Sequence, residues 1–159
     1  MKLAPKISLA FMLCTVGMAS AQKQLSSCSF LNSTFTLPET MVVSEASEEK
    51  FTASNALVHI SVFAVEEENH CIVEMHQNLL TWARENELTH LTSPESITNL
   101  NGYKGAYMEG FFEDYPVLLM QLEDPDFKNQ NLYVWLSYHP ENEDEALALA
   151  NSFSPDIAF

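Results

Sequence analysis

The segment 56–65, which reads ALVHISVFAV, constrains the fold more than any other part of the chain. Val58, Ile60 and Val62 would lie on one face of an extended strand, and Phe63 and Val65 would lie on the other. A strand that is apolar on both faces is typical of the centre of a sheet covered on both sides. The segment therefore predicts a central strand.

The hydrophobic period changes directly after this strand. Residues 66–69 read EEEN, and they supply the negative charge and the capping residue that are favoured at a helix N-terminus. Met75, Leu79 and Trp82 then follow at helical spacing. The pattern predicts a helix that ends near Glu87, followed by a loop over residues 90–101 with turn signals.

The remaining elements are predicted from alternation and turn residues. The other predicted strands are 35–37, 41–44, 51–53, 103–112, 115–123 and 131–139. Polar turns at 113–114 and 124–130 keep the last three strands close in sequence, which favours an antiparallel meander. Pro140 opens a second helix, whose apolar stripe includes Leu149 and Phe153. Together these elements predict an α+β fold, an antiparallel sheet with helices packed on it.

The first residues read as a secretory signal peptide. Lys2 and Lys6 precede an apolar run over 7–18, and Ala19-Ser20-Ala21 is a small-residue cleavage site. A membrane anchor is the competing interpretation, but a spanning helix needs about 20 apolar residues. A lipoprotein signal at Cys14 is a further alternative, although a better cleavage site follows it.

Cleavage after Ala21 divides the chain into three parts. Residues 1–21 are the signal peptide, residues 22–33 form a polar, flexible leader, and residues 34–159 form a single α+β domain without an internal linker or repeat. We therefore expect a protein that is periplasmic or secreted, and the sequence does not distinguish the two.

The charge excludes several classes of partner. The chain has 22 acidic and 7 basic residues and a net charge of −15. Nucleic acids and anionic lipid surfaces both attract basic proteins, so neither is expected as a partner. The acidity permits a basic protein partner or divalent cations, and it also keeps an exported protein soluble. No membrane span is expected, and the oligomeric state is left open.

Two cysteines remain after the predicted cleavage, Cys28 and Cys71. An even number of cysteines in an oxidising compartment is typical of a disulfide. Cys28 and Cys71 are therefore a disulfide candidate. The alternative is two unpaired thiols, because Cys28 lies in the Ser-rich leader.

No catalytic or metal-binding motif is present in the sequence. There is no G-x-S-x-G elbow and no glycine-rich phosphate loop. Cys71 and His76 are five residues apart, which places them on different faces of a helix. Asp124-x-Asp126 begins like a calcium loop, but Asn129 stands where the loop needs glycine. We therefore expect no catalytic residue, no metal centre and no cofactor.

Aromatic residues are concentrated in the predicted meander. Such residues are enriched at recognition surfaces, although they are also favoured inside sheets. Tyr103 and Tyr107 share one face of their strand, and Tyr133 and Trp135 share one face of theirs. These four residues are the candidates for a partner-binding surface, with core packing as the alternative.

The order of elements resembles the PsbP-like (Mog/PsbP) fold family. The matching features are 35–38 (FTLP) near the start, 100–105 (LNGYKG) at the entry to the meander, and 149–153 (LANSF) in the closing helix. The likeness covers about residues 34–155. It implies a non-enzymatic binding domain, because the characterised members of the family dock on protein partners.

These observations predict an exported, non-enzymatic binding domain that docks on an envelope or extracellular protein. Two alternatives from other classes stay open. An uncharacterised hydrolase would show a concave pocket with convergent polar groups. A small-ligand carrier would show an apolar cavity between the sheet and the helices.

Overall fold

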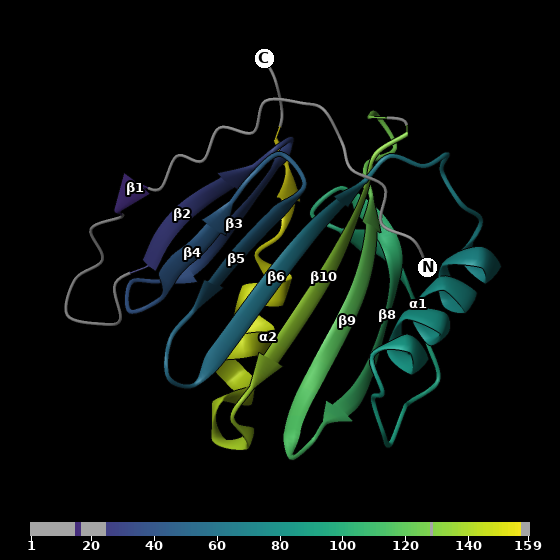
Figure 1. Ribbon diagram of the computed structural model, residues 1–159. Coiled ribbons are helices and arrows are strands. Elements are labelled where there is room, and N and C mark those ends of the chain that lie inside the picture. The colour runs from purple at the N-terminus through teal and green to yellow at the C-terminus, as the bar shows by residue number, and fades with distance from the viewer. Residues whose placement is uncertain (1–14, 17–24, 128, 157–159) are drawn as a thin grey trace.

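The computed structural model describes residues 15–16, 25–127 and 129–156. These residues form a seven-stranded and a four-stranded antiparallel sheet with two α-helices (Figure 1). The large sheet has the order β4-β5-β6-β10-β9-β8-β7. Its strands are β4 (Val42–Ala46), β5 (Lys50–Ser54), β6 (Val58–Val65), β7 (Glu95–Leu100), β8 (Tyr103–Phe112), β9 (Tyr115–Glu123) and β10 (Asn131–Tyr138).

The small sheet has the order β1-β2-β3-β11. Its strands are β1 (Thr15–Val16), β2 (Leu25–Phe30), β3 (Ser33–Pro38) and β11 (Ser154–Pro155). The helices are α1 (Ile72–Glu85) and α2 (Glu143–Asn151), and the short 3₁₀ turn η1 (Pro140–Asn142) precedes α2. The predicted signal peptide, residues 1–21, lies outside the described residues except for β1. Within the described part of the chain, no helix has the length and apolar character needed to cross a membrane.

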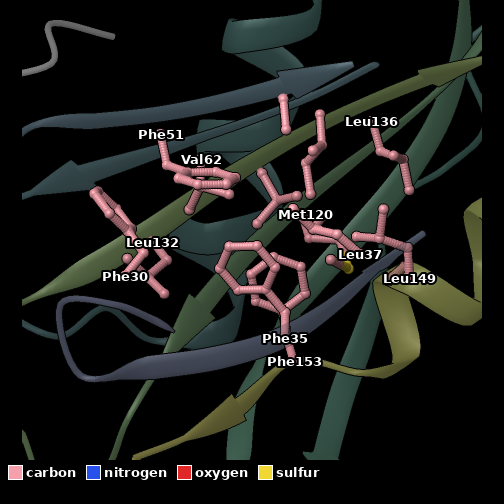
Figure 2. Close-up of a cluster of buried hydrophobic side chains, with 14 of the residues drawn as sticks. Phe30, Phe35, Leu37, Phe51, Val62, Met120, Leu132, Leu136, Leu149 and Phe153 are labelled. Atoms are coloured by element: carbon pink, nitrogen blue, oxygen red, sulfur yellow. The ribbon is translucent and has the colours of Figure 1, made fainter. Parts of the chain in front are cut away.

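The first apolar cluster lies on the face of the large sheet that carries α2 and the small sheet (Figure 2). Leu132 and Leu136 of β10 contribute to it from the large sheet, and Phe30 and Phe35 contribute from the small sheet. The ring of Phe35 stacks on that of Phe153 with a centroid distance of 4.6 Å. The cluster therefore joins the two sheets to the end of α2.

The second apolar cluster lies on the opposite face of the large sheet, beneath α1. Met75, Leu79 and Trp82 are buried on the helix, as their spacing predicts. They pack with Leu119 of β9 and Tyr133 of β10. The helix contacts β7, β8 and β9, and Figure 1 shows it beside β8. The large sheet is thus covered on both faces.

Strand β6 confirms the prediction of a central strand. It pairs with β5 on one side and with β10 on the other. Val58, Ile60 and Val62 belong to the first cluster, whereas Val65 belongs to the second and Phe63 packs against it. The apolar character of both faces therefore reflects burial in two separate clusters.

Helix α1 begins two residues later than the acidic run suggests. Its N-cap is Cys71 rather than Asn69, and the Cys71 backbone N–H donates to Glu74 Oε2 at 2.8 Å. Hydrogen bonds from the backbone and from the side chain of Cys71 lower the pKa of Glu74. The helix ends at Glu85, and Glu87 beyond it has a positive φ of 58°.

The leader expected over residues 22–33 contains an ordered strand. Residues 25–30 form β2, which pairs along its whole length with β3. Cys28 and Phe30 are 0% and 1% exposed. The serines make the composition of this segment polar, and a polar composition predicted a loose leader. Serines on the outward face of β2 are at least partly exposed, whereas Cys28 and Phe30 enter the core.

The α+β class is confirmed, with antiparallel sheets and two helices packed on the larger one. The meander is confirmed as β8, β9 and β10, which pair in that order. The expected loop over 90–101 instead contains β7, which pairs with β8 at the edge of the sheet. Its sequence, ESITNL, is mostly exposed, so it lacks the apolar alternation that marks a half-buried strand.

Candidate functional site

An open cleft of about 520 Å³ lies between α2 and the β7–β8–β9 side of the large sheet. Residues 96–100 of β7 form one wall, and Leu147 and Ala150 of α2 form the other. Leu118 and Met120 of β9 form an apolar floor. The cleft therefore combines an apolar base with a wall supplied by an edge strand.

The turn between β7 and β8 fixes one end of this cleft. Asn101 and Gly102 have positive φ values of 53° and 110°, a conformation that asparagine and glycine tolerate best. Asn101 Nδ2 donates to the carbonyl oxygens of Asn151 and Phe153, both at 2.9 Å. The turn is thus fastened to the C-terminal end of α2, which holds the two walls together.

The partner-surface candidate Tyr107 lies in the wall of the cleft. Its hydroxyl donates to Glu95 Oε2 at 2.6 Å, and this bond to a carboxylate raises the pKa of Tyr107. Glu109 is the one charged residue among the residues that line the cleft. This lining offers an apolar surface, hydrogen-bonding groups and negative charge.

The four aromatic candidates do not form one surface. Tyr103 is 3% exposed in the first cluster, and Tyr133 is fully buried in the second. Trp135 is half-buried and packs edge-to-face against Trp82. Tyr103 and Tyr107 thus lie on one face of the sheet, while Tyr133 and Trp135 lie on the other. Core packing accounts for Tyr103 and Tyr133, and burial raises the pKa of both phenols.

The structure does not join Cys28 to Cys71. Cys28 is buried in the first cluster, on the face of the large sheet that carries the small sheet. Cys71 is exposed at the start of α1, and α1 packs on the opposite face. The expected bridge is therefore not formed, because the large sheet separates the two thiols.

This separation predicts two different thiol reactivities. We expect the Cys71 thiol to react rapidly with a chromogenic thiol reagent in the native state, since Cys71 is exposed. Access of the reagent to Cys28 should require urea, because Cys28 is 0% exposed. The control is Cys71→Ser, which should abolish the rapid reaction. A disulfide is indicated instead if neither thiol reacts, even in urea, until a reductant is added.

Sequence reasoning did not identify the residues of β7 and α2 that line the cleft. They come from two distant segments, and neither carries a chemical motif. Among the residues that the structure describes, no three histidine, cysteine, aspartate or glutamate side chains are grouped to hold a metal ion. No model of a known protein family matches the chain, and no curated protein gives a sequence match to it. Function is therefore inferred from the geometry of the cleft.

Proposed function

We propose that this chain is an exported, non-enzymatic binding domain that docks on an envelope or extracellular protein. The cleft between α2 and β7 is its binding site, and an extended segment of the partner is the occupant. The observation that carries the proposal is the wall of consecutive residues 96–100 along an apolar floor. Five consecutive residues of a strand span roughly 13 Å between their outer Cα atoms, which suits a short extended segment.

The lining defines the chemistry of the partner segment. Its apolar side chains would pack on Leu118 and Met120, and its main chain would face the polar groups of Thr98 and Asn99. Glu109 and the net charge of −15 favour a partner with basic residues beside the apolar ones. Peptides recognised beside edge strands use the same combination of main-chain hydrogen bonds and side-chain pockets.

The proposal also includes export through a signal peptide and membership of the PsbP-like fold family. The basic residues, the apolar run over 7–18 and the small residues before Gln22 support a signal peptide. The succession of strands, helix, meander and terminal helix supports the PsbP-like fold, whose characterised members are docking domains. An acidic, exported domain with an open cleft is consistent with both.

The test uses the exported chain, expressed with its own residues 1–21, as bait for envelope or medium proteins of its source. Changing both Ile97 and Leu147 to lysine places two charges in the walls of the cleft. We expect the affinity for a captured partner to fall by at least about tenfold, which is about 1.4 kcal/mol. Val73→Lys is the matched control, because Val73 is 59% exposed on α1, across the large sheet.

The bound segment is then identified by hydrogen exchange on both proteins. Protection of residues 96–100, together with one extended segment of the partner, is the expected result. Equal loss of binding in the cleft variant and in Val73→Lys would contradict the proposal. If native mass spectrometry instead shows a small apolar molecule bound to the chain and lost in the cleft variant, the protein is a small-ligand carrier.

A further inference from the structure

Helix α1 covers only part of its own face of the large sheet. It contacts β7, β8 and β9, and the same face continues over β10, β6 and β5. Phe63 of β6 and Trp135 of β10 lie at the boundary, where both rings meet the ring of Trp82 edge-to-face at 6.0 Å. Both rings remain partly exposed. We call the β5–β6–β10 part of this face the open face.

The strand pairing shows which side chains share the open face, because residues paired across neighbouring strands lie on the same side of a sheet. Its central side chains are two aromatic rings and four hydroxyl or imidazole groups: Phe63, Trp135, Thr52, His59, Ser61 and Ser137. Thr52 Oγ1 and His59 Nε2 lie 3.2 Å and 3.0 Å from Ser61 Oγ. The polar groups of the open face therefore bond to one another between the rings.

The open face carries no negative charge. Strands β5, β6 and β10 contain no acidic residue, although the chain has 22 of them. Burial and the nearby Lys50 lower the pKa of His59, so its imidazole is neutral at pH 7. At the rim, Lys50 Nζ lies 3.4 Å from Glu45 Oε2, which balances its charge. The open face is thus an uncharged surface on a molecule with a net charge of −15.

We propose that the open face binds a second copy of this chain across a two-fold axis. Two copies with the same large charge repel each other where their carboxylates approach, and this repulsion is smallest at an uncharged surface. In a two-fold dimer each surface meets an identical one. Rings and hydroxyl groups would then face the same groups of the partner, and no unpaired charge is buried. The two large sheets would pack face to face at about 10 Å.

The size of the open face predicts a weak dimer. Strands β6 and β10 have 8 residues each, and such strands are about 27 Å long, while three adjacent strands are roughly 14 Å wide. The flat area is therefore about 400 Å² per copy, whereas stable complexes bury about 1,200–2,000 Å² in total. Phe112 and Tyr115, which are 42% and 49% exposed, extend the surface beyond Trp135. The dimer does not depend on docking in the cleft.

Sedimentation velocity of the full exported chain, from about 5 to about 500 μM, measures this equilibrium. We expect the average mass to rise from that of one chain towards that of two. Raising the salt concentration from about 0.05 to about 0.5 M should lower the dissociation constant at least about threefold, because salt screens the repulsion between copies. The mass of a single chain at every concentration and salt would overturn the proposal.

Lysine substitutions test where the copies meet. Ser137→Lys leaves both rings in place and puts a charge in the open face, so we expect the dissociation constant to rise at least about tenfold. Val42→Lys should give a smaller rise, because Val42 is 70% exposed and pairs with Ser54 at the rim. Val73→Lys is the matched control, since Val73 is 59% exposed on α1 and the change in charge is identical.

Two results of these variants would contradict the proposal. Equal dissociation constants for Ser137→Lys and Val73→Lys would place the contact outside the open face. The other result concerns carbohydrate, which also stacks on aromatic rings and bonds to hydroxyl groups. If maltohexaose quenches the tryptophan fluorescence of a monomeric original chain but not that of Ser137→Lys, the open face is a carbohydrate-binding surface.

Discussion

Replacing Phe153 by alanine should reduce the free energy of unfolding by about 3–5 kcal/mol, the usual cost of removing a buried phenylalanine ring. Phe153 is 0% exposed, and its ring stacks on Phe35 at 4.6 Å with an interplanar angle of 19°. Phe35 in turn meets Phe51 edge-to-face at 5.2 Å. The ring therefore couples the end of α2 to both sheets, and the cavity left by alanine has rigid walls.

Urea denaturation at neutral pH measures this loss. Domains are stable by only about 5–15 kcal/mol, so the variant should unfold at a much lower urea concentration. Phe112→Ala is the matched control, because Phe112 is 42% exposed and its loss should cost about 1 kcal/mol or less. Similar losses in both variants would show that Phe153 does not connect the two sheets through the core.

The local pattern of the sequence was sufficient to predict the elements with strong periodicity. The alternation over 56–65, the helical stripe from Met75 to Trp82 and the meander are all confirmed. In each of these elements the apolar side chains face a cluster that the element itself helps to form, so burial leaves a periodic signal in the sequence.

Strands β2 and β7 were not predicted, for the same physical reason. One face of each is largely polar and exposed. Their strand character comes from pairing with β3 and β8 through main-chain hydrogen bonds, to which any residue except proline can contribute as a donor. Such pairing depends on the arrangement of other segments, so the sequence of the strand alone does not reveal it.

The candidate site was predicted only in part. Tyr107 was selected as a surface aromatic, and it does line the cleft. The same reasoning selected Tyr133, which is buried under α1, because aromatic residues in strands serve both cores and surfaces. The walls come from 96–100 and from α2, which the fold brings together around the Asn101 hydrogen bonds. No local sequence pattern predicts that these two segments lie close together.

The largest backbone effect is expected at Gly105, in the middle of β8. Gly105 pairs with Leu122 of β9 and with Ile97 of β7. A Cβ atom added at this position would overlap the backbone carbonyl oxygen of Gln121. Backbone on a paired strand cannot move aside without breaking the β8–β9 ladder. We therefore expect Gly105→Ala to cost about 3 kcal/mol or more, the upper range for overpacking, as measured by urea denaturation.

Gly110 of the same strand provides the control. A Cβ atom there would approach Leu91 Cδ2 at 2.9 Å, the end of a side chain that can rotate, and the carbonyl oxygen of Thr89 at 3.2 Å. Gly110→Ala should therefore cost about 1 kcal/mol or less, partly because alanine restricts the unfolded chain by about 0.4–1 kcal/mol more than glycine does. Both variants make the same chemical change in one strand, so the difference between them measures the close approach of β9 to β8 at Gly105. Equal losses would mean that the backbones of β8 and β9 are not in contact at Gly105. The floor of the cleft, Leu118 and Met120 of β9, would then lie further from β7 than this register allows.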